Sequence, residues 1–239
     1  KKIVSFLQKN LLIFIIKKVN NFIFLGKGEY LLASKMFPKF KDKFKFIPFG
    51  INLEFWKPSR NYTANEKEYI LFVGNDGNRE FEQVIDIANT IKDVKIKIIT
   101  SHDISKSIVN ENAEVIYGNW HNDALTDANL KEYYENALLT FIPLKETYQP
   151  SGQSVALQSM SLGVPVMITK TMGFWDIEKF KQFKNIIFIE NNTTENWINL
   201  LNSTLANHDL LNKISKDSLE TVRNHYNQND FFKKMEGLI

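Results

Sequence analysis

The residues best suited to chemistry stand in one stretch, "QPSGQSVALQSMSLGVPVMI", at positions 149–168. A small polar turn precedes a run with helical spacing, and the first amides of a helix have no acceptor within it and lie at the positive end of its dipole. Gly152 removes the side chain where a ligand would approach the backbone. The pattern predicts an anion site at Ser151, Gly152, Gln153 and Ser154, with Ser151 as the helix N-cap. The alternative is the cap and stop that any strand-helix-strand unit needs.

A second candidate is the loop "GNDGNRE" at positions 74–80. It does not match G-x-G-x-x-G, and no acidic ribose partner follows at the right distance, so a dinucleotide site is weakly supported. Gly74, Asn75 and Arg79 are candidate phosphate contacts, and Arg79 in the first turn of the following helix would clamp a phosphate bidentately. The alternative is a plain strand-to-helix turn with Arg79 on the surface.

The third candidate is "YGNW", where an apolar run ends at positions 117–120. Tyr117, Gly118 and Trp120 could present backbone and an aromatic face to a flat base. The alternative is that Trp120 packs in the core.

These loops lie in a regular alternation of short apolar runs and helical runs that begins at residue 69. Strands alternating with helices indicate a parallel, doubly wound sheet, in which ligands bind beyond the carboxyl ends of the strands. Strands are predicted at 69–74, 94–100, 113–118, 138–143, 164–169 and 185–190. Helices are predicted at 79–91, 129–137, 154–162 and 174–183, followed by a helical tail from 195 to the end. Gly163 would end the helix at 154–162, and Pro165 would open the next strand.

The part before residue 69 has a different character. Helix, strand and helix are predicted at 5–20, 21–26 and 27–37, the last stopped by Pro38. A polar stretch follows, so we divide the chain into a segment 1–48, a linker 49–68 and a domain 69–239.

Length and composition indicate one or two globular domains. The chain has 239 residues, of which 44% are hydrophobic, no cysteine and four histidines. The absence of cysteine excludes disulfides, thiolate metal sites and a cysteine nucleophile, and it favours a reducing, cytoplasmic compartment. With so few histidines we also expect no metal site.

Charge is unevenly distributed along the chain. Residues 1–48 carry eleven lysines against Glu29 and Asp42, a net charge of +9, which leaves −6 for the remainder. Such a basic edge could contact the inner face of an anionic membrane or an acidic partner, and the alternative is a solvated face. The basic residues here are all lysine, interleaved with Phe and Ile, so we expect no nucleic acid partner.

The apolar run at 11–16 is far shorter than the ~20 residues of a membrane span, and no cleavage pattern of a secretory signal follows it. The initial Lys-Lys without a methionine suggests a fragment.

Taken in order, "FIPFGIN", "ILFVGNDGNREFEQVIDIA", "LKEYYENALLTFIPL", "SGQSVALQSMSLGVPVMIT" and "MGFWD" carry a resemblance. Together they resemble the C-terminal, donor-binding half of a retaining glycosyltransferase of the two-Rossmann-domain GT-B class, in the group 1 (family 4-like) set that includes sucrose synthases. The resemblance covers roughly residues 46–239, and residues 1–45 are similar to the last elements of that family's acceptor domain. It implies a nucleotide-diphosphate sugar as donor and no cofactor. It places the diphosphate on residues 151–154 and on the basic residue opening the first helix, the ribose near Gln158 and the base near the "YGNW" strand end.

The sequence departs from the family at two points. The family often carries E-x7-E, but here the first position is Pro150 and the second is Gln158. The usual R-x4-K falls at Asn75 and Glu80, which leaves Arg79 as the nearest substitute. A glutamine still bonds a sugar hydroxyl, and the leaving diphosphate carries the developing charge, so loss of a carboxylate is not loss of function.

We therefore expect transfer of a hexose, with retention, from a nucleotide-diphosphate sugar to a glycan or lipid-linked acceptor. The alternative is a non-catalytic nucleotide-binding module or a subunit of a two-chain transferase. A nucleotide-sugar epimerase is a third reading, disfavoured by the scarcity of histidine near the predicted loops.

Overall fold

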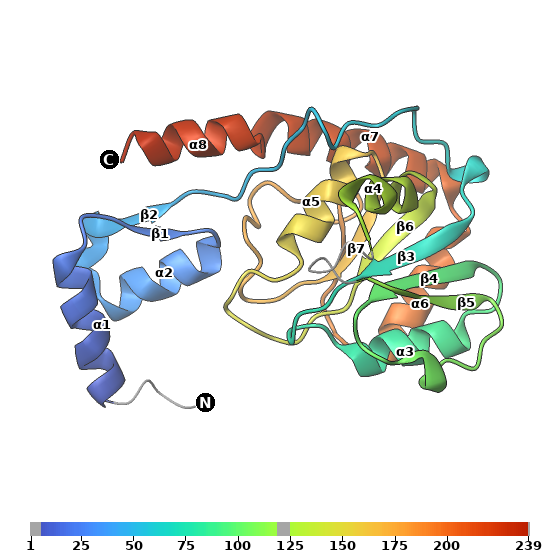
Figure 1. Ribbon diagram of the computed structural model, residues 1–239, viewed down its shortest axis with the longest axis horizontal. Coiled ribbons are helices and arrows are strands. Elements are labelled where there is room, and N and C mark those ends of the chain that lie inside the picture. Colours follow the sequence, from blue (N-terminus) through green and yellow to red (C-terminus); the bar gives the residue numbers. More distant parts are fainter. Residues whose placement is uncertain (1–5, 119–124, 239) are drawn as a thin grey trace.

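The computed structural model describes residues 6–118 and 125–238. Its main feature is a six-stranded sheet in which every pair of neighbours is parallel, with the order β5-β4-β3-β6-β7-β8 (Figure 1). The strands are β3 (Tyr69–Val73), β4 (Lys95–Thr100), β5 (Ala113–Tyr117), β6 (Ala137–Ile142), β7 (Val166–Thr169) and β8 (Ile187–Ile189). The central strands β3 and β6 are buried along their whole length, as expected of parallel strands covered on both faces. The predicted doubly wound sheet is confirmed.

Helices cover both faces of this sheet (Figure 1). They are α3 (Phe81–Thr90), α4 (Asp127–Glu135), α5 (Gln153–Ser161), α6 (Thr194–Leu205) and α7 (His208–His225). Successive residues of a strand point to opposite faces, so Ile70 and Phe72 of β3 enter the core beneath α3 and α6. Leu71 and Val73 enter the core beneath α4 and α5.

The chain reverses its direction across the sheet between β3 and β6. From β3 it proceeds through β4 to β5 at one edge, and from β6 it proceeds through β7 to β8 at the other. The loops that follow β3 and β6 therefore leave from adjacent strands and diverge. In doubly wound sheets the space between two such loops is where ligands bind.

The N-terminal part forms a small lobe of its own. It consists of α1 (Phe6–Lys18), β1 (Phe22–Phe24), α2 (Lys27–Met36) and β2 (Phe44–Phe46), as predicted for its first three elements. Strands β1 and β2 form a separate two-stranded parallel sheet. Ile16, Phe37 and Phe44 are its buried centre.

Two chain segments join the lobe to the large sheet, side by side. The Ile51 amide donates to the Tyr226 carbonyl at 2.9 Å, and the Gln228 amide donates to the Ile51 carbonyl at 2.9 Å. Helix α8 (Gln228–Glu236) then runs back to the lobe, where the Asn21 side chain donates to the Leu238 carbonyl at 3.0 Å (Figure 1). The division at 48 and 68 stays a prediction, although Ile51 of the proposed linker is buried in the core of the large sheet.

The helix predicted at 174–183 is wrong, because this segment is a series of turns. At about 100° per residue, a helix would direct Trp175 and Phe180 about 140° apart. The turns instead bring Phe174, Trp175 and Phe180 together, with ring centroids 4.0 Å apart for the first pair and 5.5 Å apart for Trp175 and Phe180. Burial of three aromatic rings in one cluster outweighs the helical spacing.

The helical tail is confirmed, as three helices rather than one. Helices α6, α7 and α8 are separated at Asn207 and Asn227. Each asparagine side chain accepts a hydrogen bond from the backbone amide of a residue in the next helix, Leu210 and Asn229. These are N-caps, which start a new helix at each point.

Candidate functional site

A cleft of about 330 Å³ lies where the loops after β3 and β6 meet. The structure brings together Arg79 from the first loop and residues 151–154 from the second, as predicted. The residues that line the cleft are Phe49, Asp76, Asn78, Arg79, Gln149, Pro150, Ser151, Gly152, Gln153 and Ser154.

Gly152 is the N-cap of α5, with φ +72° in the left-handed region. A residue with a Cβ is strained in this conformation, which explains the glycine. The prediction that Ser151 caps the helix is wrong, since the left-handed turn places Ser151 one position outside. The Ser151 hydroxyl oxygen instead accepts a hydrogen bond from the Asn78 side chain at 2.9 Å. That bond links the two loops and leaves the hydroxyl proton free to donate.

The α5 start offers backbone donors to the cleft. The Ala156 amide is bonded to the Gly152 carbonyl at 2.9 Å, so the amides before it lie ahead of the helix ladder. Helix α5 has nine residues, enough for a dipole to develop. The turn and the helix start are therefore present where the anion site was predicted, and anion binding there stays a prediction.

Arg79 is buried, with 3% of its surface exposed, so the alternative of a surface arginine is wrong. It also precedes α3 by two residues instead of lying in the first helical turn, because Glu80 is the N-cap. The loop is held by the Glu80 amide on the Pro143 carbonyl at 3.1 Å. A Cβ on Gly74 would lie 2.3 Å from Arg79 Nε, so glycine at 74 is what allows the guanidinium to lie against the backbone.

The Arg79 guanidinium carries unused hydrogen-bonding capacity. Within the described part of the chain, its Nε and Nη1 have no hydrogen-bond acceptor, and its one ion pair joins Nη1 to Asp76 Oδ2 at 3.2 Å. Burial lowers the pKa of Arg79, and Asp76 opposes that shift. A buried cation with one partly exposed counter-charge is suited to a ligand anion.

Gln153 shows the same property. Only 7% of the residue is exposed, and its Nε2 has no acceptor among the described residues. Buried donors are normally satisfied, so an unpaired amide in a cleft indicates a place for a ligand oxygen. Gln153 and Arg79 thus add side-chain donors to the amides of the α5 start.

Asn75 was predicted to contact a phosphate, but its side chain bonds to protein groups instead. Its Nδ2 donates to the Gly118 carbonyl at 3.0 Å, and its Oδ1 accepts from the Ser101 amide at 2.6 Å and the Thr100 hydroxyl at 3.1 Å. The side chain therefore ties together the ends of β3, β4 and β5. It does not line the cleft.

Replacement of Asn75 by alanine is expected to lower the free energy of unfolding by about 1–3 kcal/mol, because a backbone amide and a carbonyl lose their partner. Urea denaturation followed by circular dichroism measures this change. A variant that keeps its stability and loses nucleotide affinity would return Asn75 to the phosphate contacts.

Gln158 is half-buried on α5, four residues after Ser154, and it does not line the cleft. Its side-chain oxygen accepts from the hydroxyl of the buried Tyr134 at 3.5 Å. The predicted ribose contact remains a prediction, and the structure adds this second partner.

The predicted base-binding residues end β5. Tyr117 is exposed and Gly118 is buried, while Trp120 lies outside the described residues. The Asn75–Gly118 bond holds this strand end beside the loop of Arg79. A base at Tyr117 and a phosphate at Arg79 would thus lie on neighbouring loops.

Sequence reasoning missed Phe49, Asp76, Asn78 and Gln149 as cleft residues. Asp76 and Asn78 could have been found, since they precede Arg79 closely in a polar loop. Phe49 is the first residue of the predicted linker, and no local signal points to it. Pro150 faces the N-terminal lobe, because its ring lies 3.0 Å from where a Cβ on Gly26 would be.

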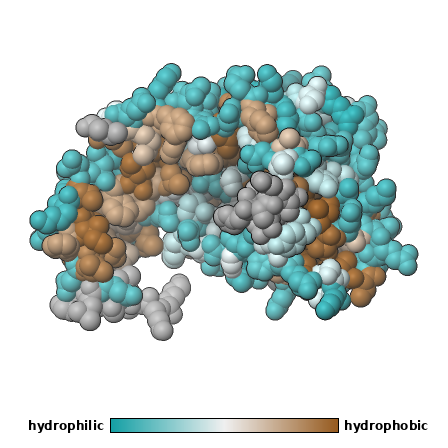
Figure 2. Space-filling view, in the orientation of Figure 1, coloured by the Kyte–Doolittle hydropathy of each residue, from teal (hydrophilic) through white to brown (hydrophobic). Residues whose placement is uncertain are grey.

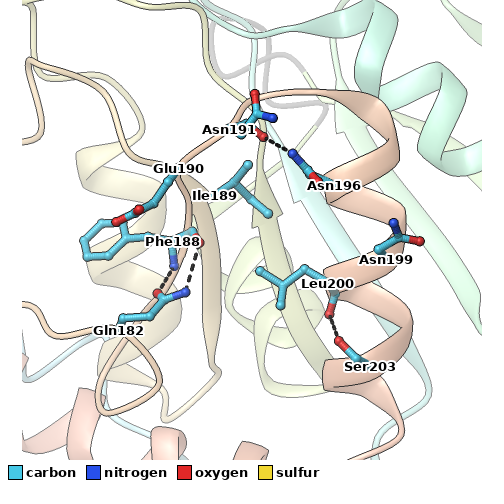
Figure 3. Close-up of a pocket in the computed structure, with 9 residues that line it drawn as sticks. All are labelled: Gln182, Phe188, Ile189, Glu190, Asn191, Asn196, Asn199, Leu200 and Ser203. Carbon is cyan, nitrogen blue, oxygen red and sulfur yellow. Dashed lines mark hydrogen bonds between the residues drawn. The ribbon is translucent and has the colours of Figure 1, made fainter.

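A larger cavity, of about 500 Å³, lies between β8 and α6 (Figure 3). Its amides are mostly satisfied: Gln182 bonds both backbone groups of Phe188, and Asn196 bonds the Asn191 carbonyl at 3.0 Å. Gln182 thereby covers the free edge of β8. We assign the site to the smaller cleft, which has the unpaired donors and lies at the switch point.

The fold is shared with solved structures of glycosyltransferases. Sucrose-phosphate synthase from Thermosynechococcus elongatus superposes with a TM-score of 0.78 at 15% identity, over 98% of this chain and 61% of that one. The chain has the GT-B fold. A TarM variant from S. aureus, in complex with fondaparinux, alpha-GlcNAc-glycerol and UDP, matches this GT-B chain with a TM-score of 0.76 at 13% identity, over 97% of this chain and 46% of that one. Anabaena HepE, in complex with UDP and glucose, matches with a TM-score of 0.73 at 12% identity, over 99% of this chain and 68% of that one.

The GT-B chain described here thus spans from about half to two thirds of the length of these structures. No family model and no curated protein matches its sequence.

Proposed function

We propose that the protein is a glycosyltransferase that moves a hexose, with retention, from a nucleotide-diphosphate sugar to a glycan or lipid-linked acceptor. The observation that carries the proposal is the buried Arg79 guanidinium, which faces the start of α5 at the switch point and has two nitrogens without a hydrogen-bond acceptor among the described residues. The fold supports it, and so do two of the similar structures, which were solved in complex with UDP.

The chemistry follows from where negative charge develops. When the bond between the sugar and the diphosphate breaks, the leaving diphosphate gains charge. The amides of residues 152–154, the Ser151 hydroxyl and the Arg79 guanidinium are fixed donors at that place, and preorganised donors stabilise developing charge without reorganisation. No metal or cofactor takes part in this proposal.

A non-catalytic nucleotide-binding module remains the second candidate, and a specific observation favours it. Asp76 is the one carboxylate among the residues that line the described cleft, and it is paired with Arg79. Pro150, in the first E-x7-E position, packs toward Gly26. A module of this kind would bind nucleotide-sugars without turnover and would co-purify with a second chain in gel filtration.

A thermal-shift panel across uridine, guanosine and adenosine diphosphate sugars tests the proposed function. A ligand at 100 times its Kd stabilises the fold by about 2.7 kcal/mol, a readily measured shift in Tm. Release of nucleoside diphosphate on addition of candidate acceptors then separates the transferase from the module. If no nucleotide-sugar in the panel stabilises the protein, both the transferase and the nucleotide-binding module are overturned.

The ribose is proposed to bind Gln158. Replacement of Gln158 by glutamate is expected to keep or raise nucleotide affinity, since a carboxylate accepts from two hydroxyls, whereas leucine is expected to lose about 1 kcal/mol or more of binding free energy. Leucine also leaves the Tyr134 hydroxyl without this acceptor, so urea denaturation must accompany the calorimetry. Equal affinities in all three proteins would remove Gln158 from the ribose site.

The N-terminal lobe is proposed to touch the inner face of an anionic membrane in a cytoplasmic protein. On α1, Leu11 and Phe14 are 60% and 59% exposed next to the exposed Lys17 and Lys18, and Figure 2 shows apolar surface over this lobe. Apolar side chains flanked by lysines suit an anionic interface. No helix among the described residues is long and apolar enough to cross a membrane.

Co-sedimentation with vesicles of anionic lipid is expected at low salt and should weaken as salt rises, because surface charges are screened. Replacement of Phe14 by serine should reduce it further. The matched control is Phe55→Ser, an exposed phenylalanine outside the lobe. Vesicle binding that changes neither with salt nor with Phe14→Ser would contradict the proposal.

A further inference from the structure

Asp76 occupies the place that a ligand anion would take. Its Oδ2 lies 3.2 Å from Arg79 Nη1, and Nη1 lies 3.5 Å from where a Cβ on Gly152 would be. The same guanidinium nitrogen thus faces both the carboxylate and the start of α5. Arg79 is 3% exposed, whereas the Asp76 side chain is 49% exposed. The arginine is fixed in the protein, and the aspartate can turn toward solvent.

The Asp76 carboxylate also has a structural task that does not need its charge. Its Oδ1 accepts from the Asn78 amide at 2.9 Å, which closes a local turn. A neutral acceptor can serve there equally well. The negative charge at this position therefore has no structural task apart from the pair with Arg79.

We propose that Asp76 is a built-in competitor for the anion site that discriminates the donor from the released nucleoside diphosphate. This inference rests on the proposed function. The diphosphate of a nucleotide-sugar has no terminal ionisable phosphate, but the free nucleoside diphosphate does, with a second pKa near 6. The product carries about one more negative charge at neutral pH. A carboxylate beside the site repels the product more than the donor, which favours product release.

The variant Asp76→Asn removes the charge and keeps an acceptor for the Asn78 amide. We expect it to bind inorganic pyrophosphate and UDP at least tenfold more tightly than the parent, with a smaller gain for UDP-glucose. The difference between the UDP and UDP-glucose gains should grow from pH 5.5 to pH 7.5, as the terminal phosphate of UDP ionises. Isothermal calorimetry with EDTA present measures all three ligands. Pyrophosphate makes the test independent of the base.

The matched control is Asp93→Asn, the same charge change at an exposed residue between α3 and β4. It lies at the amino end of β4, whereas the cleft lies beyond the carboxyl ends of β3 and β6. Its affinities should stay within about twofold of the parent. If Asp76→Asn folds poorly, Asp76→Ser removes the same charge and still offers an oxygen to Asn78.

Unchanged or weaker binding in the Asp76 variants, or equal gains for UDP and UDP-glucose, would overturn the inference. So would a failure of pyrophosphate to bind either protein. A loss of affinity in the Asp76 variants when the titration is repeated with Mg²⁺ in place of EDTA would make Asp76 a cation ligand and would also overturn it. Failure of the proposed function has another signature, because there the parent binds none of the nucleotide-sugars in the panel.

Discussion

Replacement of Gly152 by valine is expected to reduce nucleotide-diphosphate affinity by roughly 100-fold or more, equivalent to about 3 kcal/mol. The added side chain would meet the protein beneath the turn, and would not extend into the open cleft. A Cβ at position 152 would lie 3.0 Å from Ile142 Cγ2 and 3.5 Å from Arg79 Nη1, so a valine would press on the core and displace the guanidinium. The left-handed φ of +72° adds strain, of the order of 1–2 kcal/mol. The substitution should therefore also destabilise the fold. Calorimetric titration with UDP, with urea denaturation in parallel, measures both effects.

Gly163 supplies the matched control. It lies just beyond the other end of α5 with φ +76°, and a Cβ there would meet Ser215 at 3.2 Å. Gly163→Val should lose comparable stability and keep nucleotide affinity. If both variants bind UDP like the parent, the phosphate site lies elsewhere in the protein.

Replacement of Arg79 by methionine should lower nucleotide-diphosphate affinity by about 1.5–3 kcal/mol, the range for a hydrogen bond to a charged group, or roughly ten- to 150-fold. The fold should stay as stable or become more so. The Arg79 side chain is 3% exposed, and two of its nitrogens have no hydrogen-bond acceptor among the described residues. The ion pair of Nη1 with the half-exposed Asp76 only partly compensates the desolvation of the guanidinium before the ligand arrives. Affinity and stability are thus expected to change in opposite directions. Calorimetry and urea denaturation measure the two quantities on one sample.

Arg60 is a suitable control for this second result. It is exposed, and its guanidinium donates to the Asn136 side chain at 2.9 Å, away from the cleft residues. Arg60→Met should leave nucleotide affinity unchanged. A stability loss in Arg79→Met with full affinity would make Arg79 a structural residue.

Taken together, the two results would separate the two parts of the site. In the proposed site, Gly152 sets the backbone geometry of the turn, and Arg79 supplies the positive charge. Because Arg79 Nη1 lies close to the turn at Gly152, the losses of affinity caused by the two substitutions should not add in the double variant.

The order of the strands in the large domain was readable from sequence, and so was the glycine turn at the start of α5. Apolar runs alternating with helical spacing predict a parallel sheet because strands covered on both faces must be apolar along their length. The glycine at 152 between small polar residues predicts a turn that needs no side chain. These signals are local, and each is contained in about twenty residues.

The environment of the charged and polar side chains was decided only by tertiary structure. Arg79 and Asn75 stand in the same polar loop, and the sequence offers both equally as phosphate contacts. In the structure Arg79 is buried with donors that lack an acceptor among the described residues, whereas the Asn75 side chain ties three strand ends together. Asp76, Phe49 and Pro150 come to the cleft or its wall from three segments that only the fold brings together. The turns at 174–183 follow from ring contacts that include Phe188, on a strand outside the segment. Sequence periodicity reports which face of an element is buried, whereas hydrogen-bond partners and counter-charges depend on contacts between residues far apart in the chain, and these the folded structure alone determines.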